Sequence, residues 1–101
     1  MTEKVSLTFS ESAISDLEAL LEYYNEQGVP DAGKRIVARI VSKSEKLVSH
    51  PSRGHVVPEF GLERMREIID LPFRIVYAKE KNKVRVVRIW RSERLLNMPS
   101  E

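Results

Sequence analysis

The first quarter of the chain shows two hydrophobic periods in succession. Apolar and polar side chains alternate over residues 4–9, which predicts a short β-strand. Ser10 and Glu11 follow as a helix cap and an acidic first turn. Apolar residues then recur at helical spacing over residues 14–24, with acidic residues mostly between them. The pattern predicts an amphipathic helix that ends near Gly28, a residue type common at helix C-termini.

A second helix is predicted directly after the first. Pro30 suits its first turn, and apolar residues continue at helical spacing until Pro51 interrupts the pattern. The segment 51–61, PSRGHVVPEFG, is rich in turn-forming residues and is expected to be a loop. The two helices are therefore expected to form a hairpin, and the loop leads the chain away from it.

The C-terminal half shows the two-residue period of β-strands. Residues 63–70 are one such segment, and Leu71 with Pro72 makes a turn into a strand hairpin over residues 73–90. In the first strand of that hairpin, the alternation places Phe73, Ile75 and Tyr77 on one face and Arg74, Val76 and Ala78 on the other. In the second strand, it places Val84, Val86 and Trp90 on one face and Arg85, Val87 and Ile89 on the other.

These elements predict an α+β fold with the order βααβββ. A small antiparallel sheet is expected to pack one face against the N-terminal α-helical hairpin, which leaves the other face partly open. Arginines occur within both strands of the 73–90 hairpin, and an unpaired buried charge is very costly. We therefore expect the arginines to line the open face and to make it a binding surface.

Composition narrows the class of protein. The 101 residues fit one domain spanning 1–101, and 42% hydrophobic with 32% charged residues is ordinary for a soluble globular chain. No apolar run is long enough to cross a bilayer, and the first residues lack the plan of a signal peptide, so a cytoplasmic protein is expected. Cysteine is absent and the two histidines have no zinc-site spacing, so no metal and no cofactor are expected.

Charge is distributed unevenly along the chain. The net charge is +2, but residues 53–94 carry eleven Lys or Arg and six Asp or Glu, which gives 11 − 6 = +5, while residues 1–52 give 6 − 8 = −2 and Glu101 adds the remaining −1. The basic charge therefore belongs to the predicted sheet. This favours a polyanion or an acidic protein as the partner of that half, although the lysines near residue 81 also suit a soluble hairpin turn.

Five segments, taken in this order and at these spacings, resemble the RelE/ParE superfamily, the toxin halves of bacterial type II toxin–antitoxin pairs. They are SESAISDLEALLEYYNEQG, PSRGHVVPE, RMREI, FRIVY and RIWRSERLL. The resemblance covers nearly the whole chain. The long helical hairpin, the GHVVPE segment and the RE pair ahead of FRIVY look more like the ParE (plasmid stabilisation) branch than the RelE branch.

The two branches imply different functions. ParE-like toxins bind and inhibit DNA gyrase, whereas RelE-like toxins are mRNA interferases that cut messenger RNA on the ribosome. Either resemblance implies growth inhibition and neutralisation by a cognate antitoxin. A third alternative is a family member without toxicity that serves only as an antitoxin-binding module, and both a homodimer and a toxin–antitoxin hetero-oligomer stay open.

The nuclease alternative needs a base for the ribose 2′ hydroxyl, cations for the phosphate and a proton donor. The resemblance assigns these roles only in part, because Arg91 stands where a His is frequent and arginine is a poor general acid. The residues that match are Glu59 as the base and Arg64, Arg66, Arg74 and Arg94 as the cations.

The non-enzymatic alternative is the one we favour, and it puts target binding at the end of the last strand. We expect the target to be engaged by Arg88, Trp90, Arg91 and Arg94. The mechanism would be steric and electrostatic, with the antitoxin covering the same or an adjoining surface.

Each candidate also has a structural interpretation. Glu59 could pair with Arg53, and Arg74 with Asp70 across the turn. Tyr77 and Trp90 are more often core aromatics than platforms for bases, and His50 and His55 are expected to be solvated rather than catalytic.

Overall fold

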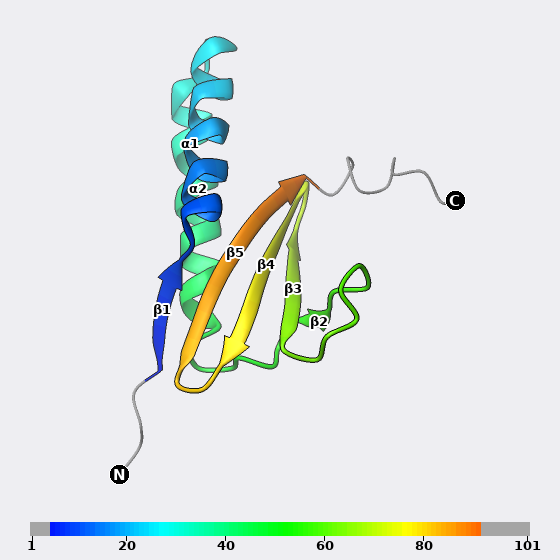
Figure 1. Ribbon diagram of the computed structural model, residues 1–101. Helices are drawn as coiled ribbons and strands as arrows, with labels where there is room; N and C mark the ends of the chain where they lie inside the picture. Colours follow the sequence, from blue (N-terminus) through cyan, green and yellow to red (C-terminus); the bar gives the residue numbers. More distant parts are fainter. Residues whose placement is uncertain (1–4, 92–101) are drawn as a thin grey trace, which may run out of the picture.

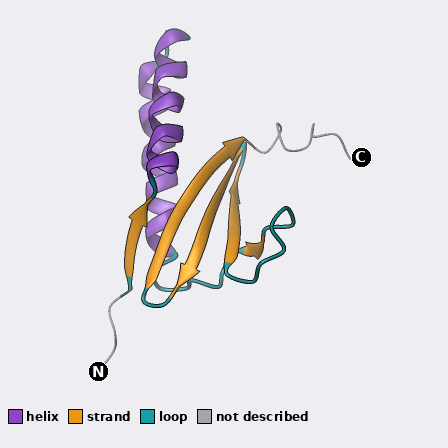
Figure 2. Cartoon of the chain, in the orientation of Figure 1, coloured by secondary structure: helices purple, strands orange, loops and turns teal. Residues whose placement is uncertain are grey.

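The computed structural model describes residues 5–91 and confirms the α+β fold class. The elements follow the chain in the order β1 (Ser6–Phe9), α1 (Glu11–Glu26), α2 (Pro30–Lys46), β2 (His55–Val56), β3 (Met65–Asp70), β4 (Phe73–Glu80) and β5 (Lys83–Arg91). The two helices form an antiparallel hairpin along one face of the sheet, and the closed end of the hairpin projects past the strands (Figures 1 and 2).

The helix boundaries follow local chemistry. The Ser10 hydroxyl accepts a hydrogen bond from the Ala13 backbone N–H at 3.0 Å and so caps α1. Gly28, just beyond the C-terminus of α1, has a φ of 80°, a conformation that glycine adopts without strain. Pro30 lies in the first turn of α2 as expected, but α2 ends at Lys46, short of Pro51.

The sheet is mixed rather than purely antiparallel. Its strand order is β1-β5-β4-β3-β2, with β1 parallel to β5 and every other pair antiparallel. Parallel neighbours need a long crossover, and here the whole helical hairpin together with β2, β3 and β4 lies between β1 and β5 in sequence. The alternation of residues 4–9 correctly predicted a strand but carried no information about its partner.

The short strand β2 lies inside the segment that was expected to be a loop. Its two residues pair with Arg66 and Glu67 of β3. Gly54, directly before β2, leaves no room for a side chain, because an added Cβ would lie 2.4 Å from the Glu67 carbonyl oxygen. The Gly54 N–H donates instead to the Tyr77 hydroxyl at 2.9 Å, which draws the chain inward and ends the ladder.

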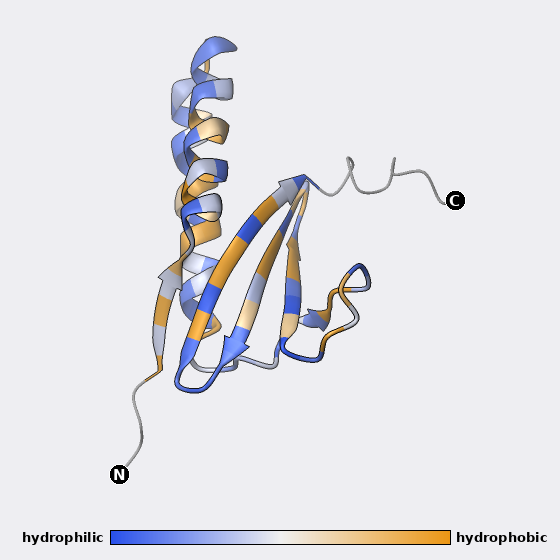
Figure 3. Ribbon diagram, viewed as in Figure 1, coloured by the Kyte–Doolittle hydropathy of each residue, from blue (hydrophilic) through white to orange (hydrophobic). Residues whose placement is uncertain are grey.

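The core lies between the hairpin and the sheet. Apolar and polar residues follow one another along the strands (Figure 3). The buried apolar residues of β4 and β5 form one cluster with buried apolar residues of the helices, so the sheet face towards the helices is apolar. Tyr77 is fully buried there, and its hydroxyl donates to the Pro51 carbonyl at 2.6 Å, so burial raises its pKa without leaving it unpaired. The largest fully buried apolar members of this core are Ile40, Leu47, Ile75, Tyr77, Val84 and Val86.

Neither helix of residues 5–91 combines the length and the apolar character needed to span a bilayer.

Candidate functional site

The end of β5 carries the residues expected to bind a target, and a β-bulge decides how they are oriented. The register between β4 and β5 shifts at Val76 and Tyr77, so that Val86 pairs with Tyr77 and Arg88 pairs with Val76. Val87 is the extra residue of the bulge, and every side chain after it changes face relative to strict alternation.

The bulge corrects the expected faces of β5. Trp90 was grouped with Val84 and Val86, but Ile89 takes that place in the core, and Trp90 lies on the open face beside Arg88. Trp90 is therefore not a core aromatic, whereas Tyr77 is. A bulge has no reliable signature in the alternation of one strand, because it is produced by pairing with the partner strand.

Arg88 is held by Asp16 of α1. Its Nε and Nη2 atoms donate to the two oxygens of Asp16 at 2.9 and 3.1 Å, which keeps the pKa of Arg88 above its usual value. Asp16 also accepts the Ile89 backbone N–H at 2.8 Å. Because β1 pairs with β5 only as far as Val86, Asp16 satisfies a strand edge that β1 does not reach.

Trp90 lies among cations and an aromatic ring on the open face. The guanidinium carbons of Arg74 and Arg88 are each 5.7 Å from the centre of its ring, within the range of cation–π contact. Phe60, from the loop before β3, lies 6.5 Å from Trp90 between ring centres. The loop therefore covers part of the face that the sequence predicted to be open.

Arg91 lies on the opposite face, where it pairs with Phe73 in the register and its guanidinium carbon is 5.6 Å from that ring. Arg91, Trp90 and Arg88 meet at a groove between the end of β5 and α1, with a volume of about 420 Å³. We call this the β5 groove. Its lining consists of Asp16, Ala19, Leu20, Tyr23, Tyr24, Phe73, Arg88, Ile89, Trp90 and Arg91.

Arg74 lies on the open face near the start of β4, the middle strand of the sheet, and is 7% exposed. Two of its nitrogens donate to the two oxygens of Glu59, each at 3.0 Å, and it also forms an ion pair with Glu67. The hydrogen bonds from Arg74 lower the pKa of Glu59 against a smaller opposing effect of burial, so Glu59 is a paired carboxylate at neutral pH.

These contacts replace two expected ion pairs. Arg74 does not pair with Asp70, because the two lie on opposite faces of adjacent strands; Asp70 binds Arg39 and Lys43 of α2 at 2.7 and 3.2 Å. Burial alone would raise the pKa of Asp70, but the hydrogen bonds from Arg39 and Lys43 lower it below its usual value. Likewise, Glu59 pairs with Arg74 and not with Arg53.

The remaining candidates for a nuclease do not converge on Glu59. Arg66 lies on the helix side of β3, where its guanidinium donates to the Ser52 and Gly54 carbonyls at 3.2 and 2.8 Å and pairs with Glu63. Arg64 is exposed just before β3, and Arg94 lies outside the described residues. Among the members of this set that the structure describes, only Glu59 and Arg74 are in contact.

Two further observations complete the survey of residues 5–91. His50 and His55 are exposed as expected, and no group of three or more His, Asp or Glu in this range is arranged to hold a metal ion. The sequence analysis missed Asp16, Tyr23 and Tyr24 as lining of the groove. Only the position of Asp16, one residue before apolar Leu17, hinted that an acid lay next to the sheet.

The sequence and the fold of the chain were each compared with known proteins. Residues 7–96 match the model of the ParE toxin of type II toxin-antitoxin system, parDE. A solved structure described as the chromosomal ParDE TA system from P. aeruginosa contains a chain similar to this one, with a TM-score of 0.73 and 22% identity. The similarity covers 89% of this chain and 98% of that one. No curated protein matches the chain.

Proposed function

Because this chain belongs to the ParE family of type II toxin–antitoxin toxins, we propose that it inhibits DNA gyrase by binding it through the β5 groove and is neutralised by a cognate antitoxin. The observation that carries the binding surface is the meeting of Arg88, Trp90 and Arg91 at one groove. Arginine and aromatic residues around an apolar cleft are the side chains that dominate protein–protein binding energy.

The groove offers an apolar floor and a cationic rim. Leu20, Phe73 and Ile89 supply apolar surface, and Tyr23 on α1 is 51% exposed beside them. Arg91 contributes positive charge where the described chain ends, next to the segment that contains Arg94. An acidic surface with a projecting apolar side chain is the complement of such a groove.

The contacts of Glu59 count against RNA cleavage. A general base must be free to accept a proton, but both Glu59 oxygens accept from Arg74 and its pKa is lowered. Arg66, the next candidate, lies on the other face of the sheet with its donors directed at loop carbonyls. Binding without catalysis is therefore the better-supported activity.

The test is a pair of assays on the purified chain: gyrase supercoiling with detection of cleavage complexes, and messenger RNA cleavage on programmed ribosomes. We expect gyrase inhibition with intact message. The double substitution of Arg91→Ala and Arg94→Ala should abolish inhibition and cellular toxicity while the protein stays folded. Arg85→Ala is the matched control, because Arg85 is an exposed arginine of β5 outside the groove.

The other outcomes are equally informative. Message cleavage with normal supercoiling would replace gyrase by the ribosome as the target. If the chain neither inhibits gyrase nor cleaves messenger RNA, a module that only binds an antitoxin would be favoured. A double variant with full gyrase inhibition would remove the β5 groove from the proposal while leaving gyrase as the target.

A further inference from the structure

A second cleft lies at the other edge of the sheet, where α2 ends beside β2 and β3. It has a volume of about 420 Å³ and shares no residue with the β5 groove. We call it the α2–β3 cleft. Its lining consists of Lys43, Lys46, Leu47, Arg53, Gly54, His55, Ile68 and Ile69.

The β3 strand has an open edge at this cleft. The Lys79 N–H donates to the Arg64 carbonyl and the Val57 N–H donates to the Met65 carbonyl, so backbone groups of even-numbered residues point to β4 and those of odd-numbered residues point outward. The outward groups of Ile69 therefore lie beyond the reach of β2, which pairs only with Arg66 and Glu67. β4 pairs with this part of β3 on one side, and among the described strands none lies along its outer edge at Ile69.

The open edge is produced by the same contact that ends β2. Gly54 turns inward to donate to the Tyr77 hydroxyl, so the chain before β2 leaves the sheet instead of continuing along β3. The Arg66 guanidinium also holds this segment, because it donates hydrogen bonds to the Ser52 and Gly54 carbonyls. The edge is thus held open by three hydrogen bonds, of which the one between Gly54 and Tyr77 is buried.

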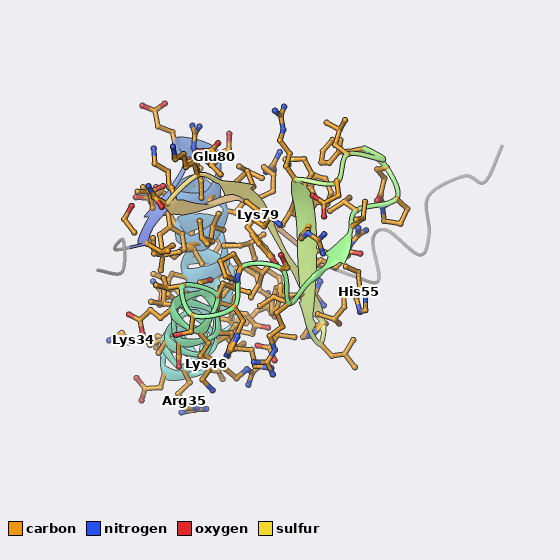
Figure 4. All side chains as sticks on the ribbon, turned by 90° about the horizontal axis from the view of Figure 1, so that it is seen from below. Lys34, Arg35, Lys46, His55, Lys79 and Glu80 are labelled. Atoms are coloured by element: carbon orange, nitrogen blue, oxygen red, sulfur yellow. The ribbon has the colours of Figure 1, made fainter. Side chains whose placement is uncertain are left out.

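The walls of the cleft are cationic and its floor is apolar. Ile68 supplies the partly exposed apolar surface of the floor, next to the fully buried Leu47. Lys46 and Arg53 stand at the rim without an ion pair among the described residues. Lys43 shares Asp70 with Arg39, so that one carboxylate faces two cations. Figure 4 looks from the end where α2 finishes, with Lys46 on the helix and His55 at the sheet edge.

From these features we infer that the α2–β3 cleft binds an extended acidic segment of a partner protein, which adds as a strand beside Ile68–Asp70. Main-chain hydrogen bonds to Ile69 would hold the segment, its carboxylates would face Lys46 and Arg53, and an apolar side chain would cover the partly exposed Ile68. The apolar floor and open strand edge favour a peptide over a nucleic acid backbone, which needs only the cations.

The inference does not depend on gyrase as the target, because it concerns the edge of the sheet away from the β5 groove. A segment bound here leaves that groove uncovered. The chain is therefore expected to hold an acidic segment and a ligand of the β5 groove at the same time.

The test uses the full chain and a fluorescent peptide of about ten residues that alternates valine with glutamate. We expect saturable binding with a Kd on the order of 100 µM or tighter, measured by fluorescence anisotropy. A peptide with lysine in place of glutamate, and a glutamate peptide N-methylated on its backbone, should both fail to bind.

Two variants separate charge from strand pairing. The double variant of Lys46→Glu and Arg53→Glu should weaken binding about tenfold or more. Ile69→Pro should do the same, because it removes the outward N–H of an edge position that tolerates proline, while Ile69→Val should bind normally. The double variant of Lys34→Glu and Arg35→Glu, at the far end of α2, is the matched charge control.

The inference is overturned if the peptide shows no saturable binding below about 1 mM. It is also overturned if the N-methylated peptide and a DNA duplex of equal charge bind as tightly as the glutamate peptide, because the cleft would then be a general polyanion surface. Unchanged binding by both Ile69→Pro and the Lys46/Arg53 double variant would put the peptide elsewhere on the molecule.

Discussion

Arg74 and Arg88 flank the same tryptophan ring at the same distance, yet their surroundings differ sharply. Arg74 is 7% exposed and binds two carboxylates, one from β3 and one from the loop before it. The Arg88 side chain is 43% exposed and binds one carboxylate on α1. The comparison teaches that a strand arginine becomes part of a binding surface only if the fold leaves its guanidinium partly uncovered.

The Arg74 cluster illustrates how a buried cation is tolerated. Charges taken out of water are costly, and two carboxylates with a cation–π contact offset that cost. Because Glu59 belongs to the loop, the same cluster fastens that loop over the open face. Arg74 is therefore a structural residue, whereas Arg88 lines a groove.

The largest expected effect comes from removing the cation of this cluster. Arg74→Met leaves Glu67, which is 8% exposed, without its partner, and we expect a loss of about 3–5 kcal/mol in the free energy of unfolding at pH 7. Urea denaturation measures it. Adding Glu67→Leu to Arg74→Met should recover more than half of the loss; an equal loss at pH 4 and pH 7 would instead assign the effect to packing.

A smaller effect is expected on the groove side. Asp16→Asn keeps an acceptor for the Ile89 N–H but loses the ionic partner of Arg88, which is already partly solvated, so we expect a loss of about 1 kcal/mol. Thermal and urea unfolding should both detect it. Glu18→Gln, on an exposed position of the same helix, is the control, and equal losses in the two variants would mean that the contact with Arg88 contributes nothing specific.

The pH dependence of stability tests the ion pair between Arg74 and Glu59 separately. The pKa of Glu59 is lowered from its ordinary value of 4.5, so its contribution to stability is complete above that value and is lost as pH falls through the lower folded pKa. Glu59→Gln should therefore be less stable than the native chain at pH 7, by less than about 1 kcal/mol, and the gap should close on acidification. A gap that widens as pH falls would contradict this pairing.

The smallest effect on stability is expected at Arg91. It is half-buried over Phe73 at the end of the last strand, so Arg91→Ala should change the free energy of unfolding by less than about 1 kcal/mol. Circular dichroism and urea denaturation measure this directly. A larger loss would place Arg91 with Arg74 as a structural residue, and its substitution could then no longer test target binding.

The pattern of the chain predicted the elements well. The first strand, both helices and the final strand hairpin occur where the periodicity indicated, because Ser10, Gly28 and Pro30 act locally and the apolar spacing is strong. The burial of Tyr77 also follows from its place in the alternation.

The site was predicted only in part. Arg88, Trp90 and Arg91 were singled out for target binding, which stays a prediction, and the structure brings them to one groove. The partners of Arg74 and Arg88 were not predicted, because each lies on another element: Glu67 on the neighbouring strand, Glu59 in the loop before it, and Asp16 on α1. Strand alternation also assigned Trp90 to the wrong face, since a bulge depends on the register of two strands.

The sequence by itself determined the α+β class, the order of the elements and the basic character of the sheet half, because local propensity, capping residues and hydrophobic period act over a few neighbouring residues. Only the tertiary structure decided which arginines are locked and which line a groove. It also decided which edge of the sheet stays open. Ion pairing, burial and strand register all depend on groups that folding brings together from distant parts of the chain.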